Sequence, residues 1–196
     1  HLMAARGAQV IDLEGLARHR GSLLGGVAGG QPSQKAFETA LAVEIAVLDP
    51  ARPVVVEAES SKVGDLIVPP AVWKAMAAAD RVEIGAPLAA RADYLARAYA
   101  DLTADREALL DALGLLKRLQ GAERVADWQA MARERRFEIL AAELCAQHYD
   151  PRYARSRARW ERDPVARLEA DRLDDAGIEE LADAILSRLE SVADRR

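Results

Sequence analysis

Residues 53–57, Pro53-Val54-Val55-Val56-Glu57, decide the fold class, because three consecutive β-branched residues after a proline are typical of a strand. Two further apolar runs, at 9–13 and 81–84, predict strands before and after it in the chain. Between these runs the apolar spacing predicts helices over residues 33–48 and 70–79. Strands that alternate with helices of this length indicate βαβ units, so the first half is predicted to be α/β with a parallel sheet.

The second half of the chain, from Pro87 onward, shows an almost wholly helical pattern. Leucines at helical spacing predict one helix that Thr103 caps and Gly121 ends. The apolar spacing predicts a further helix over residues 123–144 and an amphipathic last helix over residues 176–192.

Short signals in the sequence mark helix caps and turns rather than domain boundaries. Asp174 or Asp175 is the expected cap of the last helix, and Asp150-Pro151 is expected to form a turn. Residues 1–6 resemble the end of a helix that leads into the first strand, so we expect an earlier strand and helix of the sheet to lie upstream. The expected parts are a partial α/β core over residues 1–100 and a helical region over residues 101–196.

Composition excludes several classes of protein. The single cysteine excludes an internal disulfide framework and a cysteine-based zinc site, and it fits a reducing cytoplasm. A hydrophobic share of 51% is enough for a buried core and excludes a low-complexity chain. No apolar run approaches the ~20 residues that cross a bilayer, so we expect no membrane partner. The net charge of −5 argues against binding DNA or other nucleic acid by bulk charge alone.

Charge is distributed unevenly near the carboxyl terminus. Residues 151–172 hold seven arginines and four acidic residues, a balance of +3, whereas residues 173–196 hold seven acidic residues and three arginines, a balance of −4. Such neighbouring blocks indicate either helices joined by ion pairs or a basic face that meets phosphates, and a solvated helical face is the simpler alternative.

Polar side chains follow the first two strands, at the end of a sheet where α/β proteins bind ligands. After the first strand come two carboxylates, Asp12 and Glu14, and then the segment His19-Arg20-Gly21-Ser22. The Arg20 guanidinium, the Gly21 amide and the Ser22 hydroxyl offer three kinds of donor that together suit a phosphate. A solvated loop is the alternative interpretation.

The segment after the second strand is Glu57-Ala58-Glu59-Ser60-Ser61-Lys62. Glu57 or Glu59 is placed to hold Mg²⁺ through water or to position a nucleophile, as carboxylates at strand ends do in phosphoryl-transfer folds. The alternative is that one glutamate pairs with Lys62 and the other faces solvent.

Other candidates point to structure rather than chemistry. The glycine-rich segment 25–30 lacks the Gly-Lys-Ser/Thr ending of a P-loop, so a flexible connection is expected. Cys145 lies on an apolar helical stripe and is expected to be a core thiol, and His148 and Tyr149 are expected to cap or pack. The three histidines show no spacing typical of a metal site.

In this order, several motifs of the chain resemble those of the tRNA 2-selenouridine synthase family. The first two motifs together are quite specific. The matching segments are Val10-Ile11-Asp12-Leu13-Glu14-Gly15-Leu16-Ala17 with 19–22, then 31–38, 57–64 with Pro69, 86–91, and His148-Tyr149-Asp150-Pro151-Arg152-Tyr153.

The resemblance implies an enzyme that replaces sulfur by selenium in the wobble 2-thiouridine of tRNA. Selenophosphate would donate selenium, and geranyl diphosphate would form an S-geranylated intermediate. The family joins a rhodanese domain, which carries the catalytic cysteine, to a P-loop domain. Neither that cysteine nor the Walker A loop has a counterpart in these 196 residues, so the chain is expected to be the later part of the P-loop domain and to be inactive alone.

Combined with the resemblance, the residue patterns described above lead to a hypothesis for each site. The predicted phosphate and substrate ligands are Asp12, Glu14, His19, Arg20, Gly21, Ser22, Gln34, Glu57, Glu59, Ser60 and Lys62, with Mg²⁺ as a possible companion. The anticodon region of tRNA is expected to meet the helical half at Arg152, Arg155 and Arg159. The alternative function is that of a P-loop small-molecule kinase, because Ala86-Pro87 and then Arg91 follow a strand.

Overall fold

The structure is a computed structural model that describes residues 1–57, 60–158 and 162–193. The chain forms two compact units, which we describe separately. Unit 1 contains His1–Val82, Pro164–Ala166 and Leu181–Arg196, and unit 2 contains Glu83–Asp163 and Arg167–Glu180. The predicted α/β class is confirmed, and the division at residue 100 stays a prediction.

The elements of unit 1 are α1 (Leu2–Ala5), β1 (Gln9–Ile11), α2 (Leu13–Ala17), α3 (Gln34–Ala46), β2 (Val54–Val56), β3 (Lys62–Val63), β4 (Leu66–Ile67) and α4 (Pro70–Ala78). Those of unit 2 are α5 (Leu88–Ala98), α6 (Ala100–Ala104), α7 (Arg106–Gly114), α8 (Lys117–Gln120), α9 (Ala122–Arg133), α10 (Phe137–Leu144), a π-helical turn (Cys145–Tyr149) and α11 (Asp150–Arg157). Three elements have residues in both units, namely β5 (Val82–Gly85), β6 (Ala166–Glu169) and α12 (Asp175–Ala193). No helix within the described ranges is long and apolar enough to cross a membrane.

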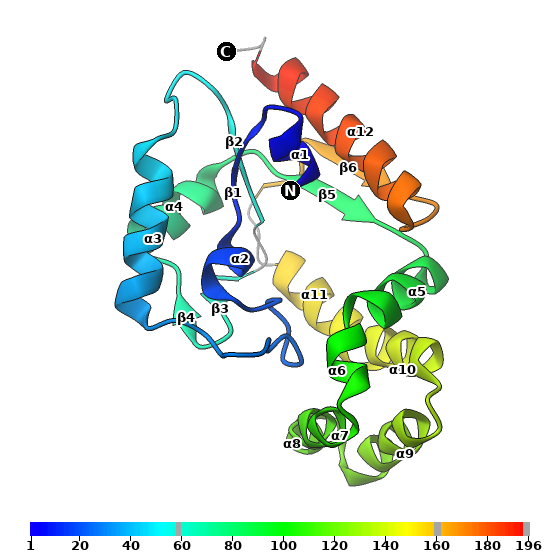
Figure 1. Cartoon of the computed structure of the whole chain (residues 1–196). Coiled ribbons are helices and arrows are strands. Elements are labelled where there is room, and N and C mark those ends of the chain that lie inside the picture. The colour runs from blue at the N-terminus through cyan, green and yellow to red at the C-terminus, as the bar shows by residue number, and fades with distance from the viewer. Residues whose placement is uncertain (58–59, 159–161, 194–196) are drawn as a thin grey trace. The chain divides into compact units, whose positions relative to one another are not determined.

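Strands β1 and β2 form the parallel pair that the sequence predicts, and they lie side by side in Figure 1. Their register pairs Gln9 with Val54 and Ile11 with Val56. Helix α3 covers this pair with Phe37 and Leu41, whose side chains are buried. Burial of two such side chains stabilises the unit by roughly 3–6 kcal/mol before the entropy cost of folding is counted.

The antiparallel hairpin of β3 and β4 is not among the strands predicted from the sequence. Its turn consists of Gly64 and Asp65, and Gly64 has a φ of +60°, the conformation that a two-residue turn of the II′ class requires at this position. Val63 and Leu66 point from the hairpin into the core of unit 1. The hairpin therefore closes one side of the unit directly after the loop that follows β2.

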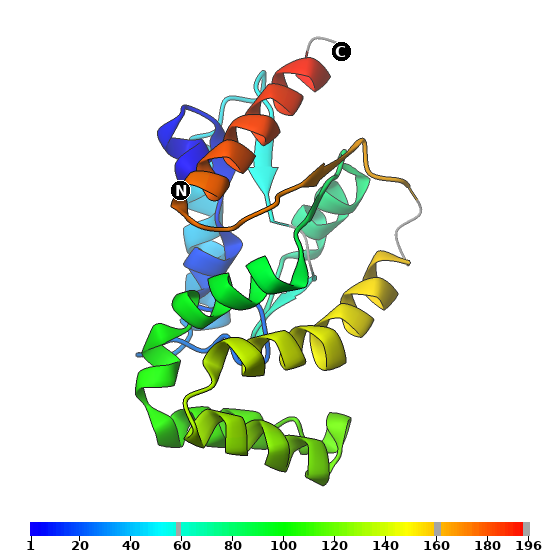
Figure 2. The same ribbon diagram turned by 90° about the vertical axis from the view of Figure 1, so that its right-hand side faces the viewer.

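Unit 2 is built on helices, with α10 packed against both α5 and α9 (Figure 2). The fully buried Trp128 of α9 and Leu113 of α7 are among the large side chains of its core. Gly121, with a φ of +87°, ends α8 as predicted, but the single leucine-rich helix expected before it is divided into α7 and α8 by a turn at residues 115–116. Thr103 as the cap is wrong, because it lies inside α6, and the carboxylate of Asp105 instead accepts the Ala108 N–H at the start of α7.

Two further helix predictions need correction. The single helix expected over 123–144 is divided into α9 and α10, because Arg135 between them has a φ of +60°, which an α-helix cannot contain. The turn expected at Asp150-Pro151 is wrong, since Pro151 lies in the first turn of α11, where its missing N–H costs no helical hydrogen bond. The last helix agrees with prediction, and its cap is Asp174, whose carboxylate accepts the Gly177 N–H.

The predicted strand at 81–84 is present as β5, but its partner is β6 from the half that was expected to be almost wholly helical. Hydrogen bonds run from the Val165 N–H to the Arg81 carbonyl and from the Ala170 N–H to the Gly85 carbonyl. The second of these bonds joins residues that lie further along both segments than the residues of the first. The second half of the chain therefore contributes a strand as well as helices.

Candidate functional site

The parallel register brings two predicted loops together at one edge of the β1–β2 pair. Ile11 faces Val56, so Asp12 and Glu57 leave the two strands at the same end. The Glu14 N–H donates to Glu57 Oε1 at 2.7 Å, which joins the loops directly. Asp12 Oδ1 accepts the Gly15 N–H at 2.7 Å and so caps α2. The carboxylates of Asp12 and Glu57 thus both bind backbone N–H groups at the start of α2, whereas the Glu14 carboxylate lies beside Gly21.

Burial raises the pKa of Glu57 above its ordinary range. The backbone N–H groups of Glu14, Glu57 and Leu13 lower this pKa, and the nearby charge of Asp12 raises it again. Because the raising effects win, Glu57 holds a proton at a higher pH than an exposed glutamate does. Protonation of Glu57 removes one negative charge from this end of the β1–β2 pair.

The segment from His19 to Gly26 forms a closed turn rather than an open loop. The Arg20 N–H donates to the Gly25 carbonyl at 2.9 Å, and the Ser22 N–H donates to the Arg20 carbonyl at 2.7 Å. Gly21 has a φ of +69°, and a side chain there would collide with the Glu14 carboxylate. The turn is therefore packed on α2, and its backbone is held before any ligand arrives.

His19 is oriented by the same turn. The Gly21 N–H donates to His19 Nδ1 at 3.1 Å, so the neutral ring carries its proton on Nε2. Burial lowers the pKa of His19, Asp65 opposes this effect, and Arg20 adds to it. At neutral pH the ring is therefore an uncharged donor at Nε2.

The other predicted ligands in unit 1 are placed differently. The Gln34 side chain binds both backbone groups of Ile67, donating to the carbonyl at 2.8 Å and accepting the N–H at 2.9 Å, so it anchors β4. Ser60 Oγ accepts the Lys62 N–H at 3.1 Å, and both residues are exposed. Glu59 lies outside the described residues. The roles of these four residues as substrate ligands stay predictions.

Metal binding gains no support from the described part of the chain. Within it, no three His, Cys, Asp or Glu side chains come together as a set that could hold a metal ion. The Asp12 carboxylate is occupied in capping α2, and Glu57 is engaged by a backbone N–H.

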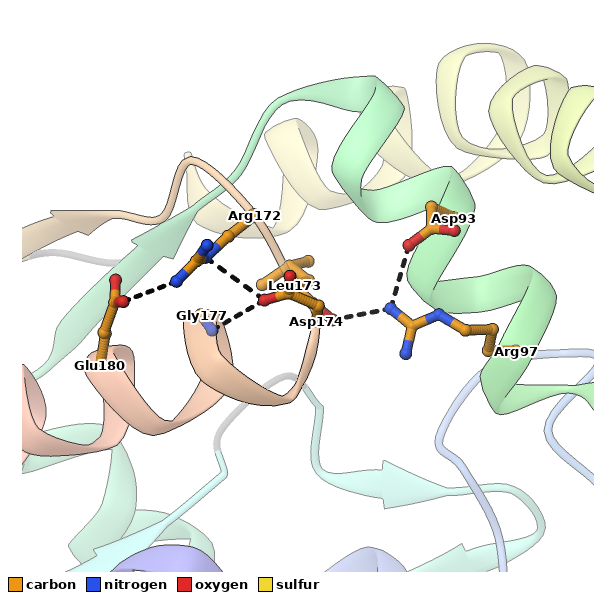
Figure 3. Close-up of polar contacts among 7 residues, drawn as sticks. All are labelled: Asp93, Arg97, Arg172, Leu173, Asp174, Gly177 and Glu180. Atoms are coloured by element: carbon orange, nitrogen blue, oxygen red, sulfur yellow. Dashed lines mark hydrogen bonds and ion pairs between the residues drawn. The ribbon is translucent and has the colours of Figure 1, made fainter.

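The arginine-rich segment of unit 2 divides into arginines that form ion pairs and arginines that do not. Glu83 of β5 binds both Arg157, at 3.2 Å, and Arg167, at 3.0 Å. Arg172, in the loop between β6 and α12, binds Asp174 and Glu180 at the start of α12 (Figure 3), so the basic and acidic blocks meet there through short-range ion pairs and not through two paired helices.

Helix α11 presents the remaining predicted tRNA ligands. Arg152 and Arg155 are exposed, stand three residues apart on one face of the helix, and form no ion pair within the described ranges. Arg159 lies outside those ranges. Two cations on one helical face, with no ion-pair partner in the part of the chain that the structure describes, are available for an external anion.

The start of α11 is fixed by a pair that the sequence did not reveal. Arg91 of α5 binds Asp150 through both ends of its guanidinium, at 2.6 and 3.0 Å, and donates from Nε to the Ala86 carbonyl at 3.1 Å. Its bond to Asp150 raises the pKa of Arg91. These contacts give Arg91, on which the kinase alternative rests, a structural task. Its partner lies 59 residues away along the chain, so no local sequence pattern marks the pair.

The two remaining reactive side chains are part of the core. Cys145 is buried as predicted, and burial raises its pKa, which disfavours the thiolate. His148 is 2% exposed, lies 3.1 Å from the Gln120 amide and packs edge-on against Tyr149. Burial and the charge of Arg152 lower the pKa of His148, so it stays neutral in the core.

Taken together, fold and site define an α/β protein whose polar loops meet at the carboxyl ends of parallel strands, where such proteins bind ligands. The family model described as tRNA 2-selenouridine synthase AAA domain matches residues 2–183, and the chain belongs to this family.

Curated relatives agree with this family. A tRNA 2-selenouridine synthase of Verminephrobacter eiseniae is 35% identical over 180 residues, covering 78% of this chain and 49% of the relative. One of Shewanella loihica is 33% identical over 174 residues, covering 74% and 46%. One of Nitrosomonas europaea is 39% identical over 93 residues, covering 46% and 24%. The chain thus spans at most about half the length of these relatives, and no solved structure matches it.

Proposed function

We propose that this chain is the part of a tRNA 2-selenouridine synthase that binds a diphosphate substrate and tRNA. The intact cytoplasmic enzyme would transfer the geranyl group of geranyl diphosphate to the sulfur of wobble 2-thiouridine, releasing pyrophosphate. Selenium from selenophosphate would then replace the geranylated sulfur, which would leave as geranyl thiol, and hydrolysis of the Se–P bond would release phosphate. The rhodanese cysteine and the Walker A loop would lie outside this chain, which alone would lack the complete activity.

A P-loop-like sheet is supported by the parallel pair in unit 1. Within the described ranges, β2 is hydrogen-bonded to β1 alone. An upstream Walker A strand would pair along the other edge of β2, and its phosphate loop would then lie at the same end as Asp12 and Glu57. That end is where the closed turn around Arg20 is found.

The observation that carries the diphosphate site is the junction of the two loops through the bond from the Glu14 N–H to Glu57. A leaving diphosphate develops negative charge, which preorganised donors stabilise. Arg20 would supply a guanidinium and Ser22 a hydroxyl, and the hydrogen bonds of the turn hold the backbone that carries both residues. Neutral His19 adds a donor that needs no change of charge.

Calorimetric titration of pyrophosphate into Arg20→Ala tests this site, with geranyl transfer by the full-length protein as the second measurement. Loss of a charged hydrogen-bond donor should weaken binding by roughly 10- to 100-fold. Arg52→Ala is the matched control, because Arg52 donates to the Gly7 carbonyl at the opposite end of the β1–β2 pair. Unchanged pyrophosphate affinity and unchanged geranyl transfer in Arg20→Ala would refute the proposal. ATP turnover by the protein that does not respond to tRNA would favour the kinase alternative.

The second part of the proposal places tRNA on α11 of unit 2. Asp150 is paired with Arg91, and Arg157 shares the Glu83 carboxylate with Arg167, which leaves Arg152 and Arg155 as the unpaired charges of this helix within the described ranges. Neutralisation of RNA phosphates by such side chains releases counterions, so affinity should fall as salt rises.

Charge reversal of Arg152 and Arg155 to glutamate should weaken tRNA binding and flatten its salt dependence by about one phosphate contact per residue. Reversal of Arg118 and Arg133, which are exposed on α8 and α9, changes the net charge equally and serves as the control. An equal loss in both double variants would show that bulk charge alone governs binding and would refute a tRNA site on α11.

A further inference from the structure

Gln31 ties three parts of unit 1 together through its side-chain amide. Its Nε2 donates to the Ala17 carbonyl at 3.3 Å and to the Val63 carbonyl at 2.8 Å, while its Oε1 accepts the Asp65 N–H at 2.7 Å. Ala17 is the last residue of α2, so this contact satisfies a carbonyl that the helix itself leaves open. The other two contacts hold both sides of the β3–β4 turn.

We call these three contacts of Gln31 a glutamine clamp. Gly64, in the turn that the clamp holds, lies against the His19 ring. A methyl group added at Gly64 would stand 2.7 Å from Gln31 Cδ and 2.8 Å from His19 Cδ2, so the glycine backbone packs against both side chains. Gly64 belongs to the turn that Gln31 fixes, and His19 follows α2 by two residues. Gln31 therefore sets both the segment that carries His19 and the surface that covers its ring.

We infer that Gln31 is a positioning residue of the proposed diphosphate site, which acts by holding the His19 ring and the turn from Arg20 to Gly25 in place. This role rests on the proposed function, since the same turn supplies the phosphate donors. Gln31 itself touches backbone groups of the protein and is not a catalytic residue.

Unit 1 contains a second glutamine clamp that serves as a matched control. Gln9 Nε2 donates to the Asp49 and Arg52 carbonyls at 3.0 and 3.2 Å, and Gln9 Oε1 accepts the Asp49 N–H at 2.6 Å. Each clamp therefore binds two carbonyls and one N–H. Gln9 begins β1, at the end of the strand pair away from Asp12 and Glu57.

The test compares Gln31→Met with Gln9→Met, because methionine keeps the side-chain length and removes all three hydrogen bonds without adding charge. Both variants should lower the Tm by a similar amount. Nitrogen-15 NMR titration of the His19 ring, assigned with His19→Gln, reads out positioning, because Asp65, Arg20 and burial together set its pKa. Titration with pyrophosphate reads out the site.

Gln31→Met alone should move the His19 pKa toward its ordinary value of about 6.5, weaken the Nε2–H preference, and reduce pyrophosphate affinity about tenfold. Identical His19 titration in Gln31→Met and Gln9→Met would overturn the inference. If Gln31→Met does not fold, Gln31→Asn applies a milder form of the same test, because it keeps an uncharged amide but is one methylene too short for the three contacts. Failure of the wild-type chain to bind pyrophosphate, with His19 still disturbed only by Gln31→Met, would refute the diphosphate function and leave the control of His19 by Gln31 standing.

Discussion

The Arg91–Asp150 pair, which joins α5 to α11, should contribute more to stability than the Arg97–Asp93 pair, which lies within α5. Arg91 binds Asp150 through two hydrogen bonds, and the two side chains are 31% and 37% exposed. Arg97 binds Asp93 through one hydrogen bond of 3.0 Å within a single helical turn, and those side chains are 47% and 57% exposed.

The expected magnitudes follow from this geometry. Hydrogen bonds to charged groups contribute about 1.5–3 kcal/mol when they are well shielded. Partial exposure lowers this value through solvent screening, so we expect a coupling free energy of about 1–2 kcal/mol for Arg91 with Asp150. A local exposed pair such as Arg97 with Asp93 should reach only about 0.3–0.5 kcal/mol.

Double-mutant cycles measured by urea unfolding test this difference. Each cycle uses the two single alanine variants and the double variant, so effects on helix propensity at either position cancel. Coupling energies that agree within about 0.3 kcal/mol would refute the argument that a bidentate tertiary pair anchors the start of α11.

Three further predictions concern single positions. The raised pKa of Glu57 means that the folded chain binds a proton more tightly than the unfolded chain. The stability of the wild type should therefore fall relative to that of Glu57→Gln as pH rises above about 4.3. Urea unfolding between pH 4 and 8 measures this difference, and parallel stability curves would contradict the prediction. Asp105→Ala should cost about 1 kcal/mol of unfolding free energy by loss of the cap on α7, whereas Thr103→Ala should stay within about 0.5 kcal/mol, and equal costs would argue against this cap. Gly121→Ala should cost about 1–3 kcal/mol in the same assay because of the φ of +87°, and a neutral effect would show that this backbone relaxes.

The sequence predicts those parts of the fold that rest on local patterns. The run Val54–Val56 and the helical spacing around Phe37 give β2 and α3, because apolar periodicity reports burial directly. Strand β6 is missed because Arg167 and Glu169 make it polar, and its extended state depends on pairing with β5. Nothing in the local sequence marks Arg135, a non-glycine residue with positive φ.

The candidate site shows the same limit. The strand-end rule brings Asp12 and Glu57 to one edge, as the parallel register then shows. The hairpin was detectable, since Gly64-Asp65 between apolar residues is a two-residue turn signal. The contacts of Gln31 were not, because its partners lie 14 and 32 residues away and are backbone groups that carry no residue identity.

The pairing of β5 with β6 has a consequence for the order of folding. All the helices from α5 to α11 lie between these two strands in the chain, so pairing of the strands closes a long loop. Glu83 and Arg167, which are bonded across it, are 84 residues apart. Closing so long a loop in an unstructured chain yields only a few short-range bonds for its entropy cost, so the helices should collapse first and shorten the effective loop. Strands β5 and β6 should then pair late in folding.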